Sequence, residues 1–164
     1  MSAFVRRDPS LEPVSYTELI EEMTALISGE PDDVANLANV SALLFDRMPD
    51  LNWAGFYLMK GGELVLGPFQ GKPACIRIKV GRGVCGSAVA EKKTIRVEDV
   101  HQFPGHIACD SASLSELVVP LLRDGAVVGV LDLDSPSVRR FSPSDQQGCE
   151  ALVGELMRHL KVAW

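Results

Sequence analysis

Four cysteines are the residues of this sequence best suited to chemistry, and each has a different setting. Cys149 belongs to an apolar stripe with helical spacing, so we expect it to be a core residue. Cys75 lies on a loop entering a strand, and Cys109 lies in a long polar loop. Cys85 lies in the first turn of a predicted helix, where free amides and the helix dipole should lower its thiol pKa. A nucleophile with one or two resolving thiols fits this set.

Two other kinds of cysteine chemistry fit the spacing less well. Structural zinc sites use close ligand pairs, and His106 with Cys109 is the one pair of that form. Cys75 and Cys85 are ten residues apart and no second close pair exists, which argues against zinc. A thioredoxin-like site is weaker still because the sequence has no C-x-x-C motif. We therefore expect no metal site.

Three carboxylates lie where the pattern otherwise predicts apolar strands. The strand predicted over residues 126–133 is apolar until its end, where Asp132 and Asp134 fall on one face because side chains alternate. Glu116 enters the preceding strand, residues 115–123, in a similar way. Charges near an apolar environment are costly unless they are paired or line a wet pocket. The ordinary alternative is that these strand-end residues reach solvent.

The register of this hairpin decides whether the three carboxylates converge. A two-residue turn at residues 124–125 would set Glu116 opposite Leu133, on the wrong face. A three-residue loop over residues 123–125, with a bulge, would set Glu116 opposite Asp132. We predict the bulged loop and a pocket containing all three carboxylates.

Two aromatic residues with polar tips, Trp53 and Tyr57, lie four apart in a strand predicted over residues 52–59. They therefore share one face. Core packing is the usual role of such a pair. The same pair also makes a suitable wall for a sulfur methyl group or a small cation.

Composition limits the classes of partner. The chain has 164 residues, which suits one domain. Sixteen Lys and Arg against 22 Asp and Glu leave a net charge of −6, and the dense basic spots are only dipeptides, so we expect no nucleic-acid partner. The longest apolar run, residues 126–131, is strand-sized, and residues 1–10 hold no apolar signal region. We expect a cytoplasmic protein without a membrane partner.

Hydrophobic periodicity predicts an α+β fold, with a central antiparallel sheet and helices packed on its faces. We expect an N-terminal arm over residues 1–14 and a single domain over residues 15–164. A capping box opens the first helix, and Asp124-Gly125 marks the clearest hairpin. The expected helices cover residues 15–29, 31–48, 86–92 and 142–160, and the expected strands cover residues 52–59, 63–66, 76–80, 94–97, 115–123 and 126–133.

Several sequence blocks occur together and in order along the chain. The blocks are W-A-G-F-Y at 53–57, L-G-P-F-Q-G-K-P-A-C at 66–75, G-R-G-V-C at 81–85, H-I-A-C-D at 106–110 and L-D-L-D-S-P at 131–136. Together they closely resemble the free methionine-(R)-sulfoxide reductases, stand-alone GAF-domain enzymes that act on the free amino acid. The match runs from about Tyr16 to the last helix. Signalling GAF domains lack this set of cysteines.

This resemblance implies roles for three of the cysteines. Cys109 would attack the sulfoxide sulfur, release methionine and become a sulfenic acid. Cys75 would resolve the sulfenic acid as a disulfide, and Cys85 matches a third family cysteine that could take part. Thioredoxin would restore the dithiol, so no bound cofactor is needed. Such an enzyme would repair methionine after oxidative stress. Family members tend to be homodimers, which the amphipathic first helix could serve, but its Leu19, Met23 and Leu26 could equally cover the sheet.

The resemblance also implies the substrate contacts. Trp53 and Tyr57 match an aromatic wall around the methylsulfinyl group, and Glu116, Asp132 and Asp134 match an acidic cluster. We expect Asp132 to bind the ammonium and Glu116 or Asp134 to donate a proton. The alternatives are a non-catalytic GAF sensor of a small molecule or oxidant and a zinc-stabilised interaction module.

Overall fold

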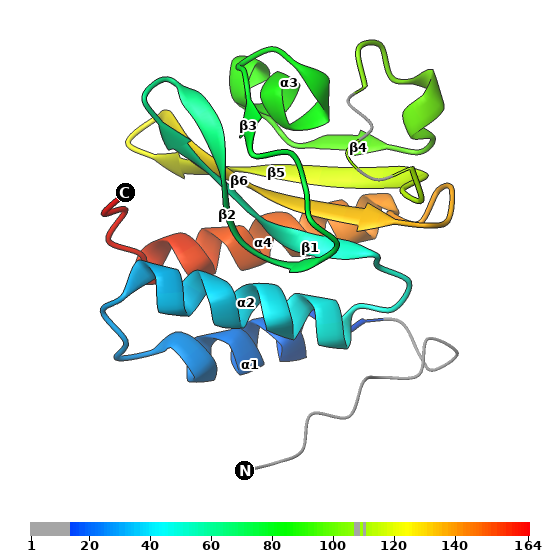
Figure 1. Cartoon of the computed structure of the whole chain (residues 1–164). Helices are drawn as coiled ribbons and strands as arrows, with labels where there is room; N and C mark the ends of the chain where they lie inside the picture. The colour runs from blue at the N-terminus through cyan, green and yellow to red at the C-terminus, as the bar shows by residue number, and fades with distance from the viewer. Residues whose placement is uncertain (1–13, 107–108, 110) are drawn as a thin grey trace.

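The computed structural model describes residues 14–106, 109 and 111–164 of the chain. Six antiparallel strands form one sheet in the order β3-β2-β1-β6-β5-β4 (Figure 1). The expected α+β fold is confirmed, whereas the arm expected over residues 1–14 falls almost wholly outside the described residues. The strands are β1 (Trp53–Lys60), β2 (Glu63–Gly71), β3 (Arg77–Ile78), β4 (Ile95–Val97), β5 (Ser115–Arg123) and β6 (Ala126–Ser135), and the helices are α1 (Tyr16–Ile27), α2 (Asp33–Arg47), α3 (Gly83–Glu91), the 3₁₀ turn η1 (Val100–Gln102) and α4 (Pro143–His159).

Polar side chains at the helix starts explain where the helices begin. Ser15 accepts a hydrogen bond from the Glu18 amide, and Asp32 does the same for the Ala35 amide. Ser142 and Asp145 form a reciprocal capping box. Such caps satisfy amides that the first helical turn leaves unpaired. None of the helices in the described part of the chain is long and apolar enough to span a membrane.

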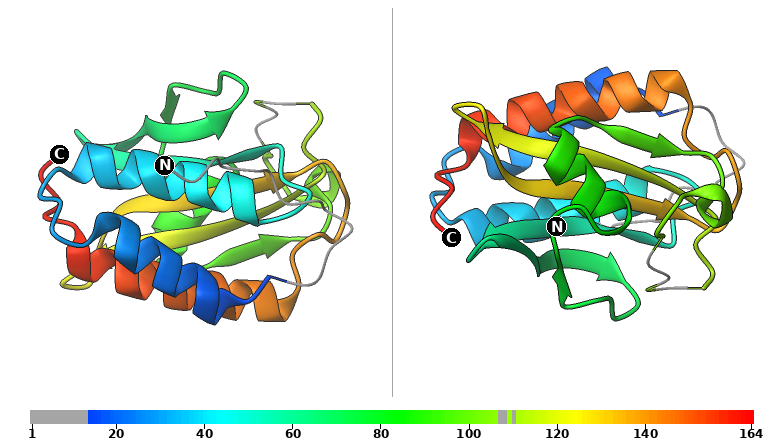
Figure 2. Two further views of the ribbon diagram at one scale, coloured as in Figure 1. Left: turned by 90° about the horizontal axis from the view of Figure 1, so that it is seen from below. Right: turned by 90° about the horizontal axis from the view of Figure 1, so that it is seen from above.

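Helices cover both faces of the sheet, so the sheet separates two apolar cores. Figure 2 shows α1, α2 and α4 beneath the sheet and α3 above it. The lower core lies between the sheet and α1, α2 and α4, and the upper core lies between the sheet and α3. The lower core contains Cys149, which is fully buried, as expected of a core residue. Burial raises the pKa of Cys149 to about 12, so this thiol stays protonated. The buried face of α2 runs through Leu37 and Val40, so Val34, which is 63% exposed, and Ala38 lie on its solvent side.

The β5–β6 hairpin differs from the predicted loop but still gathers the carboxylates. Arg123 pairs directly with Ala126 across a two-residue turn at residues 124–125, where both residues have positive φ. The predicted three-residue loop is therefore wrong. The register instead shifts between Leu121 and Leu122, where one extra β6 residue, Val128, has no partner. Because side chains alternate between the two faces of a sheet, this one-residue bulge changes which β6 residues share a face with each β5 residue from Leu121 back to Ser115.

Because of this bulge, Glu116 lies opposite Asp134 and not opposite Asp132 as predicted. Asp132 lies opposite Val118. Residues two apart on a strand share a face, so Glu116, Asp132 and Asp134 all point toward the upper core. On the other side of β6, Trp53 of β1 lies opposite Asp134. The fold therefore brings the carboxylates and the aromatic pair to one face of the sheet.

Candidate active site

A pocket opens on the upper face of the sheet, beneath the N-terminal end of α3. The strands supply its floor, and Lys72, Pro73, Ala74 and the exposed Cys109 lie at its rim. Seven of the eight residues predicted for the site line this pocket, and the eighth, Cys75, lies beside it. Its lining consists of Trp53, Tyr57, Lys72, Pro73, Ala74, Ile78, Arg82, Gly83, Val84, Cys85, His106, Cys109, Ser113, Glu116, Asp132 and Asp134, with Cys75 packed against the same apolar core.

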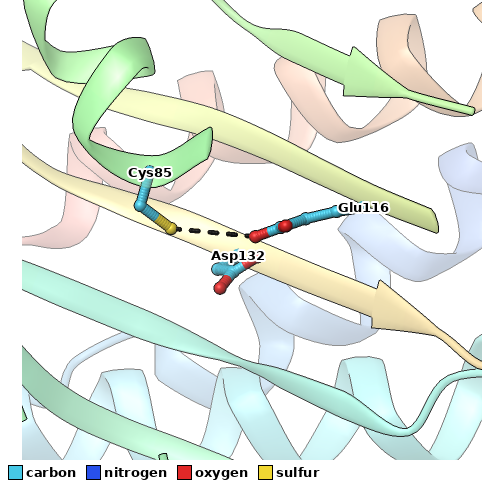
Figure 3. A group of neighbouring side chains, drawn as sticks. All are labelled: Cys85, Glu116 and Asp132. Atoms are coloured by element: carbon cyan, nitrogen blue, oxygen red, sulfur yellow. Dashed lines mark hydrogen bonds between the residues drawn. The ribbon is translucent and has the colours of Figure 1, made fainter. Parts of the chain in front are cut away.

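Two carboxylates and a thiol meet at the bottom of the pocket (Figure 3). Glu116 and Asp132 are only 7% and 5% exposed. The Cys85 Sγ atom lies 3.9 Å from Glu116 Oε1. The Oδ1 atom of Asp132 has no hydrogen-bond partner among the described residues. A buried carboxylate oxygen without a donor is costly, so this atom is suited to a donor supplied by a ligand.

Burial and crowding change the protonation of these carboxylates. Burial raises the pKa of Glu116 well above its usual value, and the nearby charges of Asp132 and Asp134 raise it further. Burial also raises the pKa of Asp132, although hydrogen bonds with Glu116 and Cys85 oppose that rise. Glu116 is thus the better proton donor, and Asp132 the better carrier of the negative charge.

The thiolate expected at Cys85 is a wrong prediction. Cys85 does lie in the first turn of α3, but its side chain is buried. Burial raises the pKa of the Cys85 thiol well above its usual value, and the charges of Asp132 and Glu116 act in the same direction. These effects outweigh the helix dipole, whose influence is worth about 1 kcal/mol or less at most exposed sites.

Cys75 and Cys109 are joined by a disulfide, with their Cα atoms 5.6 Å apart. The bond links the segment after β2 to the loop after η1, which are 34 residues apart in sequence. With the Cys109 sulfur in this bond, the His106–Cys109 pair cannot serve as two zinc ligands. The described residues whose ligand atoms do gather closely enough for a metal ion are Cys85, Glu116 and Asp132, within 4.8 Å of one another.

The aromatic residues form a stacked wall on one side of the pocket. The ring centroids of Trp53 and Tyr57 are 5.8 Å apart, and those of Trp53 and Phe69 are 5.1 Å apart. Burial raises the pKa of Tyr57, so its hydroxyl remains protonated. This hydroxyl donates to the Cys75 carbonyl oxygen at 2.9 Å, and the Trp53 indole donates to the Lys72 carbonyl oxygen at 3.2 Å.

Sequence reasoning missed four polar residues of the lining: Lys72, Arg82, His106 and Ser113. His106 Nε2 lies 4.0 Å from Glu116 Oε2, and burial lowers the pKa of the imidazole and so favours its neutral form. Ser113 accepts a hydrogen bond from the Asn52 amide at 3.0 Å. The position of His106, three residues before Cys109, is the sequence signal for this residue, although the spacing alone points to a zinc ligand.

Comparison with known protein families identifies the class of domain to which this fold belongs. The family model described as GAF domain matches residues 34–160. The fold is thus that of a GAF domain, with the pocket on the sheet face covered by α3.

Individual relatives then identify the family of GAF-domain proteins that this chain resembles. The chain is 55% identical to the free methionine-R-sulfoxide reductase of Escherichia coli over 145 residues, 88% of each protein. It superposes on the fRMsr of Staphylococcus aureus in complex with substrate with a TM-score of 0.87 and 48% identity, covering 92% of this chain and 98% of that one. The enzyme of Neisseria meningitidis, also with its substrate, gives a TM-score of 0.87 at 41% identity, covering 95% of this chain and 98% of that one. The chain belongs to the GAF-domain family and, within it, to the free methionine-R-sulfoxide reductases.

Proposed function

We propose that this protein reduces free L-methionine-(R)-sulfoxide to L-methionine with its own thiols. The observation that carries this proposal is the disulfide between Cys75 and Cys109 at the rim of a pocket with buried carboxylates. A disulfide is the product expected when one cysteine has accepted oxygen and a second has resolved it. Family membership supports the same activity.

In the first step, the Cys109 thiolate attacks the sulfoxide sulfur. The oxygen is transferred to the Cys109 sulfur, so the substrate is reduced to methionine and Cys109 is oxidised to sulfenic acid. Proton donation to the departing oxygen stabilises the charge that develops on it. Glu116 is suited to this donation because its raised pKa keeps it protonated. Arriving substrate thus meets an acid suited to proton donation beside Asp132, the carboxylate better suited to carry the negative charge.

In the second step, the Cys75 thiol attacks the Cys109 sulfenic acid, forming the disulfide and releasing water. Cys109 is exposed at the rim, where an external dithiol can reach it. Thiol–disulfide exchange with thioredoxin would restore both thiols in the cytoplasm, and no prosthetic group enters the cycle. Cys85 is a less reactive candidate for the resolving step because its raised pKa leaves little thiolate.

The lining of the pocket supports selection of a free amino acid. The Asp132 Oδ1 atom, which has no hydrogen-bond partner among the described residues, is suited to the substrate ammonium, and Arg82, an exposed residue of the lining, is suited to the carboxylate. The faces of Trp53 and Tyr57 suit the methyl group. A methionine sulfoxide within a polypeptide has no ammonium to pair with Asp132, and an unpaired buried polar group is an effective basis for rejecting a substrate.

The direct test is a single turnover with reduced protein and no external reductant. Methionine-R-sulfoxide should yield about one equivalent of methionine and a new Cys75–Cys109 disulfide. The S epimer and a peptide-bound sulfoxide should yield none. Absence of methionine from the free R epimer would reject the activity and favour a non-catalytic GAF sensor.

Asp132→Asn is expected to lower kcat/KM for the free amino acid by about 10- to 100-fold, because it removes a charged hydrogen bond to the ammonium. The preference for free over N-acetylated substrate should fall as well. Steady-state kinetics with both substrates measure this ratio. Glu150→Gln, at an exposed position of α4 beneath the sheet, is a matched carboxylate-to-amide control. An unchanged ratio in Asp132→Asn would contradict ammonium binding by this residue.

A further inference from the structure

The segment that carries Cys75 crosses the aromatic wall of the pocket. β2 ends at Gly71, which pairs with Trp53, and the chain then returns along the sheet so that Arg77 pairs with Val65 of β2. Residues 72–75 lie within this reversal. The resolving cysteine is therefore held on a connection between two strands and not within a helix or a strand of its own.

Both aromatic side chains are bonded to this segment through their single polar atoms. The Trp53 Nε1 atom donates to the carbonyl oxygen of Lys72, and the Tyr57 hydroxyl donates to the carbonyl oxygen of Cys75 itself. The two rings are 3% and 2% exposed, so water competes little for these bonds. The polar tips of the pair are thus committed to the backbone around Cys75.

Gly71, just before this segment, shows that the chain packs closely against Trp53. Gly71 has φ +131°, and a Cβ atom at this position would lie 2.7 Å from Trp53 Cδ1 and 2.7 Å from the Asn52 carbonyl oxygen. A side chain at residue 71 would therefore push the segment away from the indole. Stacking between Trp53 and Phe69 also supports the indole. The donor atoms consequently have a defined place from which to hold residues 72–75.

We propose that Trp53 and Tyr57 are positioning residues for the resolving thiol, holding the Cys75 backbone so that its sulfur faces Cys109. This role rests on the proposed function, because it concerns the step in which the Cys75 thiol displaces water from the Cys109 sulfenic acid. Two bonds at the two ends of a four-residue segment restrict it in the reduced protein, when no disulfide does so. Restricting a reactive group in its bound geometry raises its effective concentration.

The equilibrium between this disulfide and glutathione tests the proposal without any sulfoxide. One oxidised glutathione converts the Cys75 and Cys109 thiols into the disulfide and yields two reduced glutathiones, so the equilibrium constant reports the effective concentration of the two thiols. Tyr57→Phe and Trp53→Phe each remove one bond while keeping an aromatic ring. Each should lower this constant by about 3- to 10-fold, in line with the loss of one hydrogen bond.

The chain contains two tyrosines and two tryptophans, which provides a matched control for each variant. The Tyr16 hydroxyl donates to Asp145 at 2.7 Å, and the Trp164 indole donates to the Val128 carbonyl oxygen at 2.9 Å. Both contacts belong to the lower core. Tyr16→Phe and Trp164→Phe should therefore lower thermal stability without changing the glutathione equilibrium.

The outcomes separate this inference from the proposed function. A shift confined to the Tyr57 and Trp53 variants supports positioning of Cys75. An equilibrium constant equal to the wild-type value in Tyr57→Phe and Trp53→Phe overturns it, as does an equal shift in all four variants, which indicates a general loss of structure. Failure of the reductase activity appears only in the single-turnover assay, because the glutathione measurement uses no substrate.

Discussion

Glu116→Gln is expected to slow methionine release in the first turnover by about 10²- to 10⁴-fold, the range typical of a lost general acid. Glutamine has nearly the same shape but no acidic proton for the sulfoxide oxygen. Rapid-quench measurement of methionine, with reduced protein in excess over substrate, determines the rate constant. Because the protein is reduced beforehand, the later disulfide step does not enter the result.

The pH dependence of the first-turnover rate provides a second test of proton donation by Glu116. Glu116 donates its proton only below its own raised pKa, so the wild-type rate should fall as the pH rises through that value. Ionisation of the Cys109 thiol acts in the opposite direction, since the thiolate is the nucleophile. The alkaline fall should therefore be absent from Glu116→Gln, while the dependence on the thiol remains.

Two neighbouring carboxylates serve as comparisons for Glu116. Asp134→Asn is expected to slow the first step as well, because Asp134 lies opposite Glu116 and its charge helps to keep Glu116 protonated. Asp132→Asn should have a smaller effect on this rate constant at saturating substrate. Equal effects of the three substitutions would contradict the division of roles between proton donation and ammonium binding.

Serine substitutions at the two disulfide cysteines should separate the two chemical steps. Cys109→Ser is expected to release no methionine above the uncatalysed background, because the hydroxyl is a far weaker nucleophile toward sulfur. Cys75→Ser should still release about one equivalent, but turnover with thioredoxin should stop there, since no resolving thiol forms the disulfide. Methionine quantitation and mass spectrometry of the protein distinguish a sulfenic acid from a disulfide.

Cys149→Ala is the control for these substitutions, because Cys149 lies in the lower core and its thiol stays protonated. It should retain both steps, with some loss of stability from the smaller side chain. Release of methionine by Cys109→Ser would show that another thiol is the nucleophile. Continued thioredoxin-dependent turnover by Cys75→Ser would transfer the resolving role to Cys85.

Local patterns in the sequence were sufficient to predict most of the fold. The hydroxyl and carboxylate caps at Ser15, Asp32 and Ser142 mark helix starts through contacts within four residues. The Asp124-Gly125 turn likewise identifies its hairpin by conformations that few other residue pairs adopt. These features depend on neighbouring residues alone, and a single sequence contains that information.

The strand register is the part of this hairpin that the sequence prediction missed. The bulge lies at Val128, directly before Gly129, and this isolated glycine within a strand was the local signal that could have located it. The prediction placed a bulge in the turn because some shift was needed to bring Glu116 and Asp132 to one face. The expectation that the three carboxylates share one face of the sheet is thus correct, whereas the predicted pairing of Glu116 with Asp132 is wrong.

The protonation of Cys85 shows a second limit. A helix N-terminus is visible in the sequence, whereas the burial of Cys85 and its approach to Glu116 depend on packing between α3 and two strands. Because desolvation and nearby negative charge outweigh the helix dipole, the pKa of Cys85 is raised and not lowered as predicted. The bonds from Trp53 and Tyr57 to residues 72–75 were hidden for the same reason.

The pocket takes its parts from two sources with different mechanical properties. The carboxylates and the aromatic wall come from β1, β5 and β6 in the interior of the sheet, whereas the disulfide cysteines come from connections between elements. Replacing Cys75 and Cys109 would therefore leave the carboxylates and the aromatic residues on their strands. The parts of the pocket suited to binding a small molecule and the parts suited to redox chemistry are thus separate in the fold.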